Sequence, residues 1–246
     1  MPDLSDQSAL VIGGSSGMGR GAARAFAARG GDVVVTSRSA DRLDDAVRAV
    51  AHDLEPTDGV QRVGAISAVV CDLNDVVSVT KAVENLDALD HLIVTAAPGR
   101  GVTDREFFDG KFWGTHAAAV AAGQRLPPGG SMLFTSGGLA VRPTPGEWSV
   151  TCAFAAVEAL ARAFAIEYAP RRVNCIRPGL FDTASWANLK DAERQRFLAE
   201  QSAGLPAGRP ATGDDFGEAA IGILGTKYLT GQVVVVDGGA ALIAPG

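Results

Sequence analysis

The chain has 246 residues, and its 28 acidic and 22 basic side chains give a formal charge of −6. Hydrophobic residues make up 47% of it and charged residues 20%, which excludes disorder as a description of the whole chain. The acidic balance argues against a general nucleic-acid binder, because phosphate backbones favour net positive charge. Nothing approaches the roughly 18 consecutive apolar residues that a membrane-spanning helix needs.

Cysteine and histidine usage indicates a reduced protein without a metal site. Cys71, Cys152 and Cys175 are widely spaced and odd in number, which suggests neither a disulfide framework nor a zinc knuckle. The three histidines are scattered, and no clustered carboxylates accompany them. Residues 1–6 lack the basic and apolar regions of a secretory signal. We therefore expect a cytoplasmic protein with no metal, no nucleic-acid partner and no membrane contact.

Short apolar runs alternate with helical patterns along the whole chain. The sequence predicts strands over residues 8–12, 32–36, 65–71, 90–95, 131–136, 173–176 and 232–236. Helical patterns follow or separate them, over residues 18–29, 41–54, 75–86, 104–123, 150–168, 187–203 and 214–224. Asp41 is the expected N-cap of the second helix.

The predicted strands are continuous β-branched runs rather than alternating patterns. Such runs are typical of strands that are covered on both faces, as in a parallel sheet. Seven strands with intervening helices predict an α/β fold of the Rossmann type, a doubly wound parallel sheet with helices on both faces. No linker rich in Pro, Gly or Ser interrupts the order, so we expect residues 1–246 to form one domain.

A glycine-rich segment connects the first predicted strand to the first helix. Glycines let the backbone turn tightly and approach a pyrophosphate, and the helix N-terminus offers free N–H groups and a positive dipole. A plain strand-to-helix connection is the alternative, but the position in the first βαβ unit favours dinucleotide binding. The residues expected to bind the cofactor here are Gly13, Ser15, Ser16, Gly17, Met18 and Gly19.

The end of the second predicted strand distinguishes the two nicotinamide cofactors. An acidic residue at this point would bind the ribose 2′-hydroxyl of NAD(H). The sequence instead reads Ser37-Arg38-Ser39, without an acid. Arg38 can pair with a 2′-phosphate, which a carboxylate would repel. A solvated arginine is common at the start of a loop, but the missing acid favours NADP(H), bound by Ser37 and Arg38.

Three later segments carry further motifs. Asp72 and Leu73 follow the third predicted strand, residues 174–179 read Asn-Cys-Ile-Arg-Pro-Gly, and residues 230–239 read Thr-Gly-Gln-Val-Val-Val-Val-Asp-Gly-Gly. Together with the glycine segment, these motifs resemble the short-chain dehydrogenase/reductase family across essentially the full chain. The resemblance implies further cofactor contacts at Asp72, Leu73, Ala96, Ala97, Pro178, Gly179 and Thr183.

The catalytic positions implied by the resemblance depart from the family pattern. The family uses Asn, Ser, Tyr and Lys, the last two as Y-x-x-x-K on a helix. Ser136 matches the serine, whereas Lys111 stands at the asparagine position. Val150 and Phe154 stand at the tyrosine and lysine positions and have no titratable proton. Losing a positioned general acid typically costs on the order of 10²–10⁴ in rate, so the resemblance implies an atypical active site.

Three functions remain open at this point. The first is an NADP(H)-dependent oxidoreductase in which Ser136 hydrogen-bonds an activated C=N, C=C or C=O group and Lys111 supplies positive charge. A surface lysine is an equally good interpretation of Lys111. The second is a catalytically silent NADP(H)-binding protein, such as a redox sensor or a non-catalytic subunit. The third is a purely structural protein that binds no cofactor in the cleft at the strand ends. The glycine segment argues against this third function. Other titratable candidates nearby in the sequence are His116, Arg142 and Glu147.

The predicted helix 150–168 is apolar almost all round and must be covered on every face. One side is expected to pack on the sheet and the other to meet a second subunit, together with the apolar segment 112–120. Family members usually form dimers or tetramers through these two helices, so the resemblance implies a homodimer or homotetramer. Segment 180–208 carries Phe181, Trp186 and Phe197 and is expected to cap the cleft over a small, apolar substrate.

Overall fold

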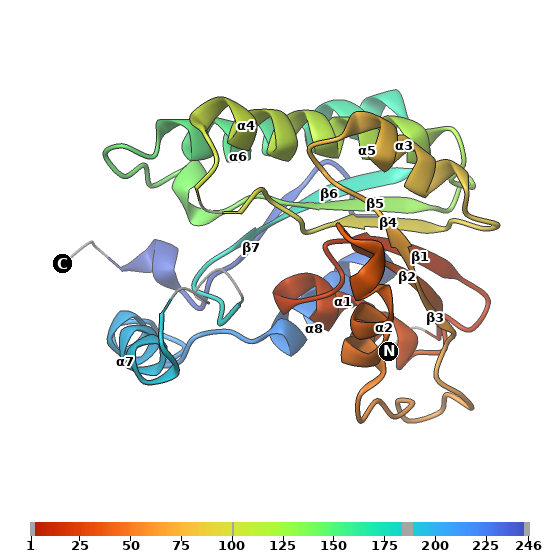
Figure 1. Cartoon of the computed structure of the whole chain (residues 1–246), viewed down its shortest axis with the longest axis horizontal. Coiled ribbons are helices and arrows are strands. Elements are labelled where there is room, and N and C mark those ends of the chain that lie inside the picture. Colours follow the sequence, from red (N-terminus) through yellow and green to blue (C-terminus); the bar gives the residue numbers. More distant parts are fainter. Residues whose placement is uncertain (1–2, 100, 184–188, 244–246) are drawn as a thin grey trace.

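Seven parallel strands form one sheet with helices on both faces (Figure 1). The computed structural model describes residues 3–99, 101–183 and 189–243. The strand order is β3-β2-β1-β4-β5-β6-β7, so the chain builds outward from β1 (Ser8–Ile12) in one direction and then returns to its other side. This order confirms the doubly wound, Rossmann-type α/β fold that the β-branched runs predict.

The strand boundaries lie close to those predicted. The other strands are β2 (Asp32–Ser37), β3 (Ile66–Val70), β4 (His91–Val94), β5 (Ser131–Thr135), β6 (Arg172–Pro178) and β7 (Val233–Val236). Neighbouring strands pair in parallel; Leu10 of β1, for example, lies opposite Val34 on one side and Leu92 on the other. The central strands β1, β4 and β5 are buried almost throughout, because helices cover both faces.

Two helical layers enclose the sheet (Figure 1). One layer contains α1 (Gly17–Ala27), α2 (Leu43–Ala51) and α8 (Gly213–Gly225). The opposite layer contains α3 (Val76–Glu84), α4 (Asp104–Phe108), α5 (Thr115–Gly123) and α6 (Trp148–Glu167). α7 (Asp191–Ser202) lies to the side of these layers, on the same side of the molecule as the short 3₁₀ turn η5 (Ala240–Leu242).

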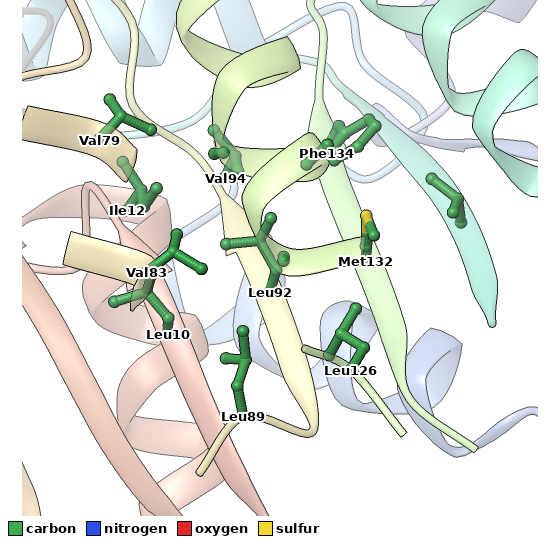
Figure 2. Close-up of a cluster of buried hydrophobic side chains, with 14 of the residues drawn as sticks. Leu10, Ile12, Val79, Val83, Leu89, Leu92, Val94, Leu126, Met132 and Phe134 are labelled. Carbon is green, nitrogen blue, oxygen red and sulfur yellow. The ribbon is translucent and has the colours of Figure 1, made fainter. Parts of the chain in front are cut away.

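Each face of the sheet has its own apolar core. Residues of β1 alternate between the two cores, with Leu10 and Ile12 on the α3 side and Ala9 and Val11 on the α1 side. Figure 2 shows the first core, to which β1, β4, β5 and α3 contribute Leu10, Ile12, Leu92, Val94, Met132, Phe134, Val79 and Val83. Burying one such side chain contributes roughly 1.5–3 kcal/mol, so the strand ends are held in fixed positions.

The second predicted helix differs from the observed one. It begins with a 3₁₀ turn, η1 (Ala40–Arg42), and its α-helical part, α2, covers only Leu43–Ala51. The prediction that Asp41 caps this helix is wrong, because the chain is already helical at Asp41. An N-cap residue needs extended backbone angles, which Ser39 adopts two residues earlier.

The predicted helix 104–123 contains a π-helical turn, η2 (Asp109–Gly114), between α4 and α5. This turn lies against the segment after β3, and a Cβ at Gly114 would overlap the carbonyl oxygen of Leu73. Single π turns inside helices occur frequently at functional sites. Here the turn carries Lys111 and buries it.

The length and composition of α6 would allow it to cross a membrane, although it contains no uninterrupted apolar run of that length. In the fold it packs along β5 and β6 and against α4. Ala153, Val157 and Ala161 on its inner side are fully buried. α6 is therefore a core helix of this α/β fold.

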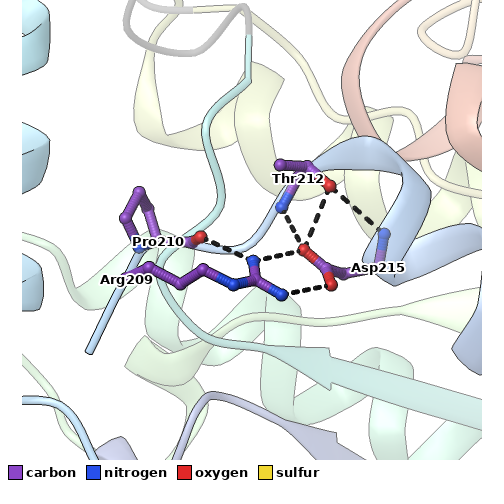
Figure 3. Close-up of polar contacts among 4 residues, drawn as sticks. All are labelled: Arg209, Pro210, Thr212 and Asp215. Atoms are coloured by element: carbon purple, nitrogen blue, oxygen red, sulfur yellow. Dashed lines mark hydrogen bonds and ion pairs between the residues drawn. The ribbon is translucent and has the colours of Figure 1, made fainter. Parts of the chain in front are cut away.

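The first turn of α8 is fixed by a capping box and an ion pair (Figure 3). The Thr212 hydroxyl accepts a hydrogen bond from the Asp215 amide, and the Asp215 carboxylate accepts one from the Thr212 amide. Arg209 donates to both Asp215 oxygens at 2.7 Å. These hydrogen bonds, led by those from Arg209, hold the pKa of the Asp215 carboxyl below its usual range. The segment that leads from α7 into α8 is thereby tied to the helix.

The close crossing of α1 and α8 requires glycine at the contact. A Cβ at Gly21 would overlap the Gly213 carbonyl, whereas a Cβ at Gly222, on the exposed side of α8, would meet nothing within 4 Å. We expect Gly21→Ala to lower the free energy of unfolding by about 3 kcal/mol, because backbone must move. Gly222→Ala is expected to raise it by up to about 1 kcal/mol through helix propensity. Urea unfolding measures both, and equal effects would contradict the close crossing.

Candidate functional site

A cavity of about 880 Å³ lies at the carboxyl ends of β1 to β5. Its lining comes mainly from the segments that follow these strands, where the strand order reverses between β1 and β4. Ligands of open α/β sheets bind in the crevice outside the carboxyl ends of the strands, at such a reversal. The volume is in the range of roughly 300–1,000 Å³ that is typical of ligand and cofactor pockets. Position and size identify this cavity as the candidate functional site.

The glycine-rich segment forms one wall of the cavity. Gly13 has a φ of +93° and Gly17 one of +51°, both in the left-handed region that favours glycine. Ser16, the N-cap of α1, makes no side-chain capping hydrogen bond to any described residue. The first N–H groups of α1 are thus available to a ligand at this wall. The predicted residues of the segment all line the cavity: Gly13, Ser15, Ser16, Gly17, Met18 and Gly19.

Two arginines line the cavity beyond the end of β2. Arg38 directly follows the strand and is exposed, and Arg42 ends η1. Ser37, also in the lining, is buried. Asp45 contributes a carboxylate to this part of the lining, but it pairs with Arg48 at 2.5 Å. This end of the cavity therefore favours an anionic group.

Most of the other predicted cofactor residues also line the cavity. Those in the lining are Asp72, Leu73, Ala96, Ala97 and Thr183. Pro178 and Gly179 are not in it. Pro178 ends β6, the Gly179 amide donates to the Val236 carbonyl at 2.9 Å, and a Cβ at Gly179 would lie 2.6 Å from the Cα of Asp237. These two residues instead hold the end of β6 against the end of β7.

Lys111 reaches the cavity from η2 and is only 1% exposed. Its Nζ donates to the Ala96 carbonyl oxygen at 3.0 Å and to the Thr135 hydroxyl at 3.3 Å. An ammonium group has three N–H donors, and the third finds no acceptor within the described part of the chain. The interpretation of Lys111 as a surface lysine is therefore wrong. The residue brings a hydrogen-bond donor to the cavity.

Burial lowers the pKa of Lys111 from 10.5 to about 8. The cause is desolvation, which disfavours the charged ammonium, and the nearby Cys175 acts weakly in the opposite direction. A proton donor works best when its pKa lies close to the operating pH. Lys111 is therefore charged near pH 7 and holds its proton less firmly than an exposed lysine does.

Phe154 lines the cavity beside Lys111. The centroid of its ring lies 5.9 Å from the Nζ of Lys111, within the range of a cation–π contact. The ring also packs edge-on against Phe107, with centroids 6.0 Å apart, and covers Gly137, where a Cβ would lie 2.5 Å from the ring. The position to which the family resemblance assigns a lysine thus holds an apolar side chain, and a different lysine lies next to it.

Ser136 lies in the lining above a buried ion pair. Its Oγ donates to Oε1 of Glu158 at 2.7 Å. Nε and Nη2 of Arg177 donate to the two Glu158 oxygens at 2.7 and 2.6 Å. Burial alone would raise the pKa of the Glu158 carboxyl, but the hydrogen bonds from Arg177 and Ser136 hold it below its ordinary value. Glu158 is therefore ionised, and it anchors the Ser136 hydroxyl.

The other titratable candidates lie outside the cavity lining. Arg142 donates to a backbone carbonyl near the C-terminus at 2.8 Å, and Glu147 is exposed just before α6. His116 packs between Trp113 and Phe164, with ring centroids 5.3 and 5.6 Å away. These aromatic contacts place His116 on the joint face of α5 and α6.

Several lining residues carry no recognisable motif and were not predicted from the sequence, because the folding of the segments around the sheet brings them to the cavity: Arg42, Asn74, Pro98 and Thr135. Of the predicted cap 180–208, Thr183 is the one described residue in the lining. Trp186 lies outside the described residues, and so does the predicted start of the 187–203 helix. Among the described ranges, no group of three His, Cys, Asp or Glu side chains could hold a metal ion.

The chain is similar to known proteins over nearly its full length. Residues 12–241 match a family model described as enoyl-(acyl carrier protein) reductase. The short-chain dehydrogenase/reductase ATR9 of Stachybotrys chlorohalonatus is 30% identical, over 98% of this chain and 100% of that protein. The 3-oxoacyl-(acyl-carrier-protein) reductase FabG of Chlamydia muridarum is 28% identical, over 97% of this chain and 98% of that protein.

The fold comparison agrees with these sequence matches. A crystal structure of a small-chain dehydrogenase in complex with NADPH superimposes with a TM-score of 0.76 and 29% identity, over 96% of this chain and 99% of that one. The family model covers most of the chain, and the seven-stranded sheet has its glycine segment at the strand reversal. The chain therefore belongs to the short-chain dehydrogenase/reductase family.

Proposed function

We propose that this protein is an NADP(H)-dependent oxidoreductase in which Lys111 is the proton donor. The observation that carries the proposal is the buried Nζ of Lys111 at the cavity, fixed by two acceptors and with its pKa lowered to about 8. The matched family model and the FabG relative are described as reductases, which supports hydride-transfer chemistry.

The residues around the cavity fit NADP(H). The uncapped N-terminus of α1 suits the diphosphate, because its first N–H groups can bind an anion, and the positive φ at Gly13 lets the chain turn sharply into this helix. Arg38 and Arg42 suit the 2′-phosphate, and a relative of similar fold is described in complex with NADPH. The remaining proposed contacts are Asp72 and Leu73 toward the adenine, and Ala96, Ala97 and Thr183 toward the nicotinamide, while Pro178 and Gly179 lie outside the lining and are not proposed as contacts. When bound, NADPH supplies a hydride.

Lys111 supplies what a family tyrosine would otherwise provide. Hydride addition to an unsaturated group leaves negative charge on the neighbouring atom, which an ammonium stabilises strongly when it is buried away from bulk water, as Lys111 is. The same ammonium then releases its proton to that atom. The Ala96 carbonyl and the Thr135 hydroxyl keep Nζ in position. Ser136, which directly follows Thr135, lies in the lining of the same cavity and is the second polar side chain proposed to contact the substrate.

The proposed substrates are small, apolar molecules with an activated C=N, C=C or C=O group. Phe154 contributes an apolar surface next to Lys111. A single donor replaces the usual tyrosine–lysine pair, so a substrate that is already polarised needs the least assistance. Segment 180–208 is the proposed cap over this end of the cavity, within a single domain that spans the chain.

A catalytically silent NADP(H)-binding protein is the second candidate. The observation in its favour is that two Lys111 N–H groups are already bonded to protein acceptors, while Phe154 fills the usual lysine position. This candidate predicts that the protein binds NADPH but that no carbonyl, imine or enone oxidises the bound NADPH. The oxidoreductase predicts that the protein binds NADPH and that at least one such compound oxidises it.

We also propose a cytoplasmic homo-oligomer that assembles through α5 and α6. Trp113 of η2 is half-exposed, and its ring contacts His116, which in turn stacks on Phe164 of α6. An aromatic cluster that spans two helices and reaches the surface suits contact with a second copy. The three cysteines are free thiols, and two of them are buried, which fits a reducing compartment.

Replacing Lys111 tests the proposed function. Lys111→Met is expected to slow NADPH oxidation on the order of 10²–10⁴-fold, because a positioned proton donor is lost. It is also expected to raise the free energy of unfolding near pH 7 by up to about 3 kcal/mol, since folding lowers the pKa of Lys111 from 10.5 to about 8 and so disfavours its charge. Stopped-flow absorbance and urea unfolding measure the two effects.

Both effects of Lys111→Met have a defined pH dependence. Below about pH 8, Lys111 is charged in the folded and unfolded states, so the added stability is complete; it declines as the pH rises toward 10.5. The wild-type rate of reduction is expected to fall as the pH rises through about 8, and the residual rate of the variant to stay flat. Lys81→Met, at an exposed position of α3, is the control. Full activity of Lys111→Met would refute the assigned role.

Arg38 is expected to select NADPH over NADH. Arg38→Ala removes a charge-assisted contact and should weaken NADPH binding by about 10- to 100-fold while leaving NADH binding almost unchanged. Arg105→Ala, at an exposed position of α4, is the matched control. Fluorescence titration measures the four affinities. Tighter binding of NADH than of NADPH by the wild type would contradict the cofactor assignment.

The aromatic cluster on α5 and α6 predicts how the protein assembles. Trp113→Glu places a charge in the proposed contact and is expected to convert the oligomer to monomers. Val77→Glu, at an apolar position near the start of α3 that is 60% exposed against 49% for Trp113, should leave the mass unchanged. Light scattering gives both masses, and a monomeric wild type would rule out the interface.

A further inference from the structure

The Ser136 hydroxyl has one proton to donate, and in the folded protein it donates this proton to Glu158. The Oγ of Ser136 donates to Oε1 of Glu158 at 2.7 Å, a short distance that is characteristic of a hydroxyl bonded to a carboxylate. A hydroxyl carries one donor and two acceptor lone pairs. Once the proton is directed at Glu158, the Ser136 oxygen can act toward the cavity only as an acceptor.

The geometry around Glu158 keeps this arrangement in place. Arg177 donates through Nε and Nη2 to both carboxylate oxygens, at 2.7 and 2.6 Å. The Glu158 side chain is 7% exposed and that of Arg177 is 19% exposed, so water competes little for these bonds. A carboxylate that is paired and desolvated in this way remains an acceptor and cannot return a proton to Ser136.

The Cys175 thiol beside Ser136 stays protonated, because burial raises its pKa to about 12 and its hydrogen bonds with the Ser136 side chain and amide offset only part of that rise. Cys175, on the neighbouring strand β6, is buried next to Ser136, and its Sγ donates to the Ile176 carbonyl at 3.5 Å. The backbone amide of Ser136 also bonds to the Ile176 carbonyl, at 2.9 Å. The Ser136 oxygen is therefore held from behind and remains in the lining of the cavity.

Two groups with opposite hydrogen-bonding character thus meet at one end of the cavity. Lys111 offers an N–H donor and has no lone pair, whereas Ser136 offers lone pairs and no free proton. A simple ketone can satisfy Lys111 with its oxygen but has nothing to donate to Ser136. A carbonyl compound with a hydroxyl or N–H on the adjacent carbon can satisfy both.

We propose that Glu158 and Arg177 are positioning residues that turn Ser136 into a hydrogen-bond acceptor and so select carbonyl substrates that carry a neighbouring hydroxyl or N–H group. This inference rests on the proposed function, because it names the substrate class of the same site. It assigns the contact with the carbonyl oxygen to Lys111 and the contact with the neighbouring donor to Ser136. Glu158 acts through Ser136 and does not touch the substrate.

The test compares the binding of benzoin and deoxybenzoin, which differ only in the hydroxyl group next to the carbonyl. Binding is measured by calorimetry to the protein saturated with 1,4,5,6-tetrahydro-NADP, a cofactor analogue that neither donates nor accepts a hydride, so that neither compound is turned over. The wild type is expected to bind benzoin about tenfold more tightly, the usual effect of one added hydrogen bond to a buried acceptor. Equal binding of the two compounds, or binding of neither, overturns the inference.

Two variants and one control identify the groups responsible for the preference for benzoin. Ser136→Ala removes the acceptor without disturbing the ion pair, and the tenfold ratio is expected to fall to about one. Glu158→Gln presents an amide N–H that can donate to Ser136 and release its proton toward the cavity, so the ratio should again fall to about one. An unchanged ratio in either variant overturns the inference. Glu167→Gln, at an exposed position near the end of α6, should keep the full ratio.

A loss of folding in Glu158→Gln would be distinguished from a loss of selectivity by a second variant. Glu158→Gln leaves Arg177 without its ionised partner, which is costly for a buried pair. If that variant does not fold, Glu158→Asp takes its place, since it keeps the charge for Arg177 and withdraws the carboxylate from Ser136 by one methylene. A merely structural Glu158 would lower the affinity for both compounds equally and leave the ratio at about ten.

The outcomes also distinguish this inference from the proposed function. If NADPH is never oxidised but the benzoin ratio depends on Ser136 and Glu158, the oxidoreductase assignment fails and the selectivity stands. If carbonyl compounds oxidise NADPH but the ratio is one in the wild type, the selectivity fails and the oxidoreductase stands.

Discussion

The burial of one ammonium group governs the chemistry of this site. Removing Lys111 from water disfavours its charge, and the two hydrogen bonds to the Ala96 carbonyl and the Thr135 hydroxyl offset only part of that cost. The π turn η2 places Lys111 there, and the absence of a side chain at Gly114 lets that turn lie against the segment after β3. A charge retained at a cost in stability is typical of a functional group.

A second buried charge system lies on the other side of the same cavity end. Glu158 and Arg177 neutralise each other, and their joint effect on the cavity is exerted through the orientation of one hydroxyl, that of Ser136. The apolar ring of Phe154 lines the cavity next to Lys111, whose side chain is itself buried from solvent. In that environment each remaining donor or acceptor has a larger effect than it would have in water.

The two ends of the cavity differ in how far apart in the sequence their residues lie. The end formed by the glycine segment and Arg38 follows from backbone constraints within one βαβ unit, and residues expected there do line the cavity. The opposite end combines Lys111 from a helix, Ser136 from a strand end and Glu158 from a second helix. No spacing rule connects these three, because each arrives on a separate element.

The sequence by itself determined the doubly wound sheet, since uninterrupted β-branched runs must be covered on both faces. It also determined the glycine turn, since glycine adopts positive φ angles at the least steric cost. It also located Ser136 and Lys111 as candidates through the family resemblance. Tertiary structure alone decided that Lys111 is buried and that Ser136 donates to Glu158. The reason is physical: burial and hydrogen-bond direction depend on which elements pack together, and that information is spread over the whole chain.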